Sequence, residues 1–198
     1  MALGDKIDSV NNPPKNILSQ LVEQDFSGFF HHYLSAQALQ FNQSQGPYGD
    51  PRVRKAFAYA INMQKAVNPV MNKGPWGQAR TIVPRPSGIM VNESAWLGDL
   101  QNSLSSYSPR SQNTEKTVEM MQAAGFERSV NGKWARDGEQ LKVQIKHYGW
   151  PNIVAYMQSV KGDLEAADFA VELTAPSTLT TDIVNGDYTV TSGFWGQS

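Results

Sequence analysis

The sequence lacks cysteine altogether, in a chain of 198 residues. Disulfide bridges, thiolate metal ligands and thiol nucleophiles are therefore excluded. The chain also lacks a charge excess, because 17 lysines and arginines balance 18 aspartates and glutamates. A nucleic-acid-binding domain would show a strong basic excess, so the composition argues against that class. With 40% hydrophobic and 18% charged residues, the composition also argues against disorder.

Long apolar runs are missing too. No stretch approaches the roughly 18–20 apolar residues that a membrane-spanning helix needs. Residues 1–6 show no apolar core of a secretory signal. We therefore expect either an intracellular protein or a chain whose native N-terminus is missing. A strand predicted at 188–195 ends three residues before Ser198, which favours a fragment of a longer chain.

Enzyme motifs are absent from the sequence. It contains no Gly-x-Ser-x-Gly elbow, phosphate-binding glycine loop, His-Glu-x-x-His motif or dinucleotide fingerprint. His31 and His32 are adjacent, so in a strand they point to opposite faces, and no further ligands follow at metal-site spacing. Asp163 and Glu165 lie two positions apart on a predicted helix, and we interpret both as part of a solvated face. The sequence therefore predicts no enzyme, no catalytic residue, no metal site and no cofactor.

The stretch 50–62 has the pattern of a helix with a defined start. Asp50 can cap the free amides of the first turn, and Pro51 suits the first helical position. One apolar stripe follows at helical spacing, formed by Val53, Phe57, Ala60 and Ile61. We expect this helix to continue to about residue 67 and to follow a strand that ends at Phe41-Asn42.

The next ordered segment begins near residue 113. Asn113 is a candidate cap for a helix over 114–124, which Gly125 ends in the left-handed conformation. Asn131-Gly132 predicts a type I′ hairpin turn, and Asp137-Gly138 predicts a second turn.

Beyond these turns, strands are predicted at 141–147, 169–173 and 188–195. The helix between the first two has a buried stripe formed by Ile153, Met157, Val160 and Leu164. A loop and a short helix separate the last two strands. This alternation implies parallel strands with right-handed crossovers, and hence an α/β domain.

Three stretches, in this order, carry a resemblance to a known family. They are Asp-Pro-Arg-Val-Arg-Lys-Ala followed by Ala-Tyr-Ala-Ile-Asn within 50–62, a helix ending in Ala-Gly-Phe within 113–126, and Asn-Gly-Lys-Trp followed by Asp-Gly-Glu-Gln-Leu-Lys-Val within 131–143. Together they resemble the family-5 extracellular solute-binding proteins, receptors that supply peptides, nickel complexes or oligosaccharides to ABC importers. The resemblance covers roughly residues 30–198.

The resemblance implies a periplasmic-binding-protein-like (type II) lobe of α/β class, with a mixed sheet flanked by helices. Residues 1–28 are then an N-terminal linker that crosses between lobes, and 29–198 form the second lobe, truncated before the return to the first. The implied partners are a small solute, the ABC permease subunits and the missing first lobe, with no nucleic acid. We expect a monomer that works in the periplasm or outside the cell, with or without a membrane anchor.

Candidate site residues follow from the strand ends, since ligands of open α/β sheets lie outside the carboxyl ends of strands. Three such ends are Phe41-Asn42, 147–150 and 193–198, and we expect them on one face. The resemblance adds the loop 74–78, which approaches the ligand cleft in the family. The predicted ligand-binding residues are Asn42, Gln43, Trp76, Gln78, Tyr148, Trp150, Trp195 and Gln197.

The resemblance leaves the ligand class open. Peptide-binding members often carry an aspartate three residues after the tryptophan of the last strand, where it pairs with the free amino group of the peptide. Ser198 stands at that position here, so this anchor is missing. Gly149-Trp150 is similar instead to oligosaccharide-binding members, in which aromatic rings stack on sugar faces. An oligopeptide is the family default and an oligosaccharide the alternative; a sensor domain without a transport role and an unrecognised hydrolase are competing classes.

Overall fold

The computed structural model describes residues 17, 20, 21, 23, 24, 35–62, 65, 66 and 112–196. In chain order, the elements of this part are β1 (Ser35–Phe41), the 3₁₀-helix η2 (Gly46–Gly49), α2 (Pro51–Ala60), α5 (Thr114–Ala123), β2 (Glu127–Arg128), β3 (Trp134–Arg136), β4 (Glu139–Gln140), β5 (Lys142–Lys146), α6 (Pro151–Ala166), β6 (Ala170–Thr174), α7 (Leu179–Asn185) and β7 (Val190–Gly196). None of these helices combines the length and apolar character that crossing a membrane requires. His31 and His32 lie outside the described residues.

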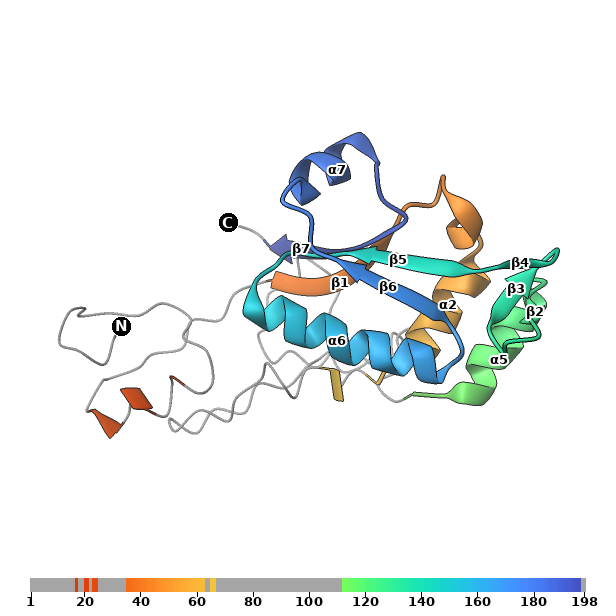
Figure 1. Ribbon diagram of the computed structural model, residues 1–198, viewed down its shortest axis with the longest axis horizontal. Helices are drawn as coiled ribbons and strands as arrows, with labels where there is room; N and C mark the ends of the chain where they lie inside the picture. The colour runs from red at the N-terminus through yellow and green to blue at the C-terminus, as the bar shows by residue number, and fades with distance from the viewer. Residues whose placement is uncertain are drawn as a thin grey trace, which may run out of the picture.

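The main sheet has four strands in the order β1-β7-β5-β6. β5 runs parallel to both β6 and β7, whereas β1 runs antiparallel to β7. Figure 1 shows α2 and α6 on one face of this sheet and α7 on the other. The short strands β2, β3 and β4 form a separate antiparallel sheet. The predicted α/β class and the parallel strands of the second half are confirmed.

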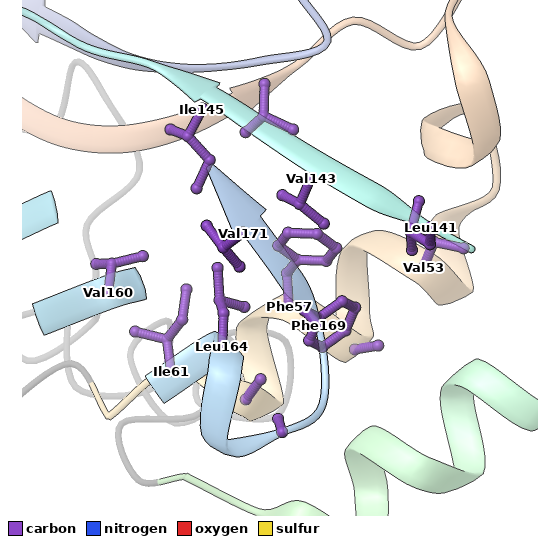
Figure 2. Packing of buried hydrophobic residues seen from close by; sticks show 14 of the residues in the cluster. Val53, Phe57, Ile61, Leu141, Val143, Ile145, Val160, Leu164, Phe169 and Val171 are labelled. Atoms are coloured by element: carbon purple, nitrogen blue, oxygen red, sulfur yellow. The ribbon is translucent and has the colours of Figure 1, made fainter. Parts of the chain in front are cut away.

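The core lies between the sheet and the two helices α2 and α6. On β5 the inward side chains alternate with exposed ones, so Val143 and Ile145 are buried while Lys142 and Gln144 are exposed. Both predicted helical stripes are buried, that of α2 with Phe57 at its centre and that of α6 over its whole length. Figure 2 shows these side chains converging from β5, β6 and the two helices. Burial of this apolar surface is the main favourable term of folding.

The predicted helix caps are confirmed. The Asp50 carboxylate accepts a hydrogen bond from the backbone N–H of Arg52 at 2.8 Å, and the Asn113 side chain accepts one from Lys116 at 3.0 Å. The Arg52 guanidinium pairs with Asp50 at 2.7 Å and also donates to the carbonyl of Ala123, the last residue of α5. One arginine therefore joins the start of α2 to the end of α5, where a cation suits the helix dipole.

The helix α2 ends earlier than predicted, and Asp163 binds the chain just after the helix end. Ile61 is extended, and the Asn62 side chain then accepts from the N–H of Lys65 at 3.0 Å. Asp163 on α6 accepts from the backbone N–H of Asn62 at 2.9 Å and from Lys65 Nζ at 2.7 Å. The solvated face predicted for Asp163 is wrong, because its side chain is only 2% exposed; Glu165 does lie in solvent.

Both predicted turns form, but the type I′ turn is the second one, to which the sequence assigned no type. Asp137 and Gly138 both have positive φ, at 54° and 81°, as a type I′ turn requires. At Asn131-Gly132 only the glycine does, with φ 75°, and its N–H donates to the carbonyl of Ser129 at 2.8 Å. The type I′ assignment of Asn131-Gly132 is therefore wrong, because the hairpin turns one residue earlier and uses Gly132 to rejoin the strand.

We predict that Asp163→Ala lowers the free energy of unfolding by about 1–3 kcal/mol, because the Asn62 N–H loses its buried acceptor. Lys65 adds little to this figure, since its side chain is 62% exposed and hydrates when unpaired. Glu165→Ala on the same helix is the matched control, with an effect within about 0.5 kcal/mol. Urea unfolding measures both; equal effects would refute the role given to Asp163.

A second prediction concerns the buried hydroxyl of Tyr48. Its side chain is 1% exposed, and its oxygen has no hydrogen-bond partner in the described part of the chain. Burial raises the pKa of this phenol to about 12. Tyr48→Phe should leave stability unchanged or raise it by up to about 1 kcal/mol.

The contrasting variant is Tyr188→Phe. The Tyr188 hydroxyl accepts a hydrogen bond from Gln40 at 2.8 Å, so its removal should cost about 0.5–1.5 kcal/mol. Chemical denaturation of both variants under one set of conditions gives the comparison. A loss for Tyr48→Phe as large as that for Tyr188→Phe would show that the Tyr48 hydroxyl has a partner.

Candidate functional site

The antiparallel direction of β1 decides which strand ends meet. Phe41 pairs with Val190 at the start of β7, and Ala36 pairs with Trp195 near its end. The two pairs are five residues apart along β7, or about 17 Å at roughly 3.4 Å per residue. The expectation that all three carboxyl ends share one face is therefore wrong for Phe41-Asn42.

The carboxyl ends of β5 and β7 do point the same way. Lys146, the last residue of β5, pairs with Thr174 at the end of β6 and with Thr191 in β7. β7 then continues to Gly196, so its end extends past that of β5. The candidate site is therefore the edge of the sheet at which residues 147–150 leave β5 and enter α6.

Two aromatic rings mark this edge. Tyr148 and Trp150 stack, with ring centroids 4.9 Å apart and an angle of 16° between planes, and we call them the aromatic pair. They lie two residues apart in the sequence, and their stacking shows that both side chains lie on the same side of the chain. Tyr148 packs against the core, whereas Trp150 is 56% exposed. The pair thus presents aromatic surface at the strand end while its inner ring rests on the core.

Asn42 and Gln43 lie at the opposite end of β1. The Asn42 side chain donates to the carbonyl of Gly186 at 3.0 Å and accepts from the N–H of Ser44 at 3.1 Å. Gln45 donates to the same Gly186 carbonyl at 3.0 Å, while Gln43 is exposed. Asn42 therefore holds the turn between α7 and β7, and its binding role stays a prediction.

Sequence reasoning missed the polar attachment of α7, because no motif marks it. Lys146 Nζ pairs with Asp182 of α7 at 2.7 Å and donates to the carbonyl of Asp187 at 2.5 Å. The hydrogen bond from Lys146 is the main cause that lowers the pKa of Asp182. Beside this attachment is a polar pocket of about 250 Å³, lined by Gln45, Gln144, Lys146, Asp187, Tyr188 and Thr189.

The remaining predicted site residues are not placed. Trp76, Gln78 and Gln197 lie outside the described residues, and only the backbone of Trp195 is described, within β7. Among the residues that the structure does describe, no three His, Asp or Glu side chains gather as metal ligands would. The aromatic pair is therefore the part of the predicted site that the geometry brings together.

Comparison with known sequences identifies one matching family. The sequence model described as bacterial extracellular solute-binding proteins, family 5 Middle, matches residues 1–198. No curated protein sequence matches the chain significantly.

Solved structures share the fold. Campylobacter jejuni NikZ in complex with Ni(L-His) superposes with a TM-score of 0.65 at 16% identity, over 93% of this chain and 34% of that one. Haemophilus influenzae OppA, complexed with the peptide RPPGFSPFR, gives 0.62 at 18% identity, over 92% and 34%. The mannohexaose-bound periplasmic oligopeptide-binding protein of a Thermotoga maritima ABC transporter gives 0.62 at 22% identity, over 83% and 30%. The chain spans about a third of the length of these relatives.

We predict that Trp150, the exposed member of the aromatic pair, is dispensable for folding. Trp150→Ala should cost about 1 kcal/mol or less, the value of one stacked and largely exposed ring. Trp134→Ala is the comparison, with an expected loss of about 3–5 kcal/mol, because this ring is 1% exposed and its Nε1 donates to Ala167 at 2.8 Å. Urea unfolding of both variants gives the values, and a loss for Trp150→Ala near that for Trp134→Ala would make Trp150 a core residue.

Proposed function

We propose that this chain, which belongs to the bacterial extracellular solute-binding proteins of family 5, is one ligand-binding lobe of a receptor that captures an oligopeptide-type solute. The receptor binds the solute outside the cytoplasm and delivers it to the permease subunits of an ABC importer. The observation that carries the proposal is the aromatic pair at the carboxyl end of β5, on a sheet of the family's fold.

The position of the pair supports a binding role. In open α/β sheets, ligands bind outside the carboxyl ends of the strands, and Tyr148 and Trp150 directly follow such an end. A largely exposed indole next to a half-buried phenol offers apolar surface at low entropic cost, because both rings are already ordered by stacking. The relative from Haemophilus influenzae holds a nonapeptide, which is the solute class proposed here.

An oligosaccharide is the second candidate, and the geometry of the same pair favours it. A flat, exposed indole that stacks on a neighbouring ring suits the apolar face of a sugar ring. The relative from Thermotoga maritima is bound to mannohexaose. The aspartate that anchors the amino group in peptide-binding members is replaced by Ser198, which also favours a ligand without that group.

The remaining parts of the proposal concern the longer protein. Residues 29–198 form the second lobe, a first lobe supplies the other wall of the cleft, and the two close on the solute as a hinge. The receptor acts as a monomer in the periplasm or at the cell surface and performs no catalysis. A sensor built on the same lobe would bind a solute without engaging a permease. Genes for a permease and an ATPase beside the gene for this protein would favour transport, and their absence would favour a sensor.

Calorimetry with two probes tests the ligand class. The longest natural protein that contains this chain is titrated with the peptide RPPGFSPFR and with mannohexaose. We expect micromolar or tighter binding of one probe, and a loss of at least about tenfold for Trp150→Ala, the effect of removing about 1.4 kcal/mol of stacking.

Val184→Ala is the control for this experiment, because Val184 lies on α7 and is 81% exposed, and it should leave binding unchanged. We also expect the isolated 198-residue chain to bind either probe only weakly, because one lobe supplies only part of the cleft. Submicromolar binding by the isolated chain, or unchanged binding by Trp150→Ala, would contradict the proposal.

A further inference from the structure

The geometry points to His147 as the positioning residue of the aromatic pair. Its buried imidazole holds the peptide between Tyr148 and Gly149 in one orientation, and this determines the orientation in which the Trp150 ring contacts a ligand. This inference rests on the proposed function, because it assigns His147 a role in a binding site formed by the pair.

His147 occupies a place where the strand pattern calls for an apolar residue. Leu141, Val143, Ile145 and His147 alternate inward along β5 and its extension, and all four are buried. The His147 side chain is only 4% exposed. Burying a polar ring costs free energy unless it is hydrogen-bonded, so an imidazole here needs a partner that an aliphatic side chain would not.

The partner is the backbone of the aromatic pair itself. His147 Nδ1 lies 2.9 Å from the carbonyl oxygen of Tyr148. A carbonyl oxygen only accepts, so Nδ1 carries the proton and donates it, which fixes that nitrogen as the protonated one. The backbone N–H of His147 donates in turn to the carbonyl of Thr174 at the end of β6, at 2.9 Å. His147 thereby ties the Tyr148 peptide to the rigid sheet.

The backbone after Tyr148 needs a hydrogen bond of this kind to hold its conformation. Gly149 separates the two rings, and a glycine leaves the backbone freer than any other residue does. On the far side, Pro151 holds Trp150 in extended geometry, with φ −69° and ψ 136°. Pro151 restricts the backbone of Trp150, and His147 holds the Tyr148 peptide. Gly149 is therefore the flexible residue between two restrained segments. Without the His147 hydrogen bond, the Tyr148 peptide could rotate and the stack could open.

Two nearly isosteric variants separate the hydrogen bond from the packing. His147→Asn places an amide N–H close to the position of Nδ1, whereas His147→Leu has the same shape without a donor. The chain is labelled with 5-fluorotryptophan, and Trp150→Phe identifies the Trp150 resonance among the five tryptophans. We expect His147→Asn to keep the fluorine resonance of Trp150 at its wild-type position, and His147→Leu to shift or broaden it.

The inference is overturned if the two variants give the same Trp150 resonance, or if His147→Leu leaves that resonance unmoved. Thermal unfolding of both variants accompanies the spectra. Should either variant fail to fold, the wild-type protein decides the matter: imidazole ¹⁵N shifts must show His147 protonated at Nδ1, and protonation at Nε2 alone would refute the hydrogen bond.

A binding measurement connects the inference to function. In the longest natural protein, His147→Leu should weaken binding of the responding probe, RPPGFSPFR or mannohexaose, by about tenfold, and His147→Asn should restore it. Equal binding by the two variants would refute the positioning role. If neither probe binds the wild type, the proposed ligand class fails, while the fluorine and nitrogen spectra still test the positioning of Trp150.

Discussion

The packing of one side chain, Phe57, holds together segments that lie far apart in the sequence. Its ring contacts Phe41 at the end of β1 edge to face, with centroids 5.2 Å apart, and Phe169 before β6 at 4.7 Å. Tyr48 of η2 lies 6.1 Å away, and Phe169 leads on to Trp134 of the small sheet. The main sheet, the small sheet and α2 therefore share one aromatic cluster. These contacts are dispersive and apolar, so they stabilise the fold most where water is fully excluded. Phe57 is 1% exposed and meets that condition.

Local signals in the sequence predict most of this fold. The caps at Asp50 and Asn113, the left-handed Gly125 and the helical stripes all follow from the chemistry of single residues or from one period. Strand and helix alternation likewise predicts the parallel strands, because only a crossover can connect them. The caps, the left-handed glycine and the stripes depend on residues close in the sequence, and the parallel direction depends only on the order of the elements, so a sequence contains this information directly.

Features that depend on residues far apart in the sequence could not be predicted in the same way. The direction of β1 depends on β7, about 150 residues away, and nothing in the residues of either strand specifies it. The burial of Asp163 depends on where α2 breaks, since its partners are the backbone of Asn62 and the side chain of Lys65. At the site, the flat faces of Tyr148 and Trp150 could be predicted from residue type, but their stacking could not. His147 carries one signal in hindsight, a polar residue at an inward position of the alternation.

The pairing of β1 with β7 has a consequence for synthesis. Phe41 leaves the ribosome 149 residues before Val190, its partner in the sheet. At translation rates of about 5–20 residues per second, β1 exists without its partner for about 8–30 seconds. During that time the Phe57 cluster can bury Phe41 only in part, and an unpaired strand is a template for pairing with other chains. Of the strands that the structure describes, the first to be made is thus paired only when the last has emerged.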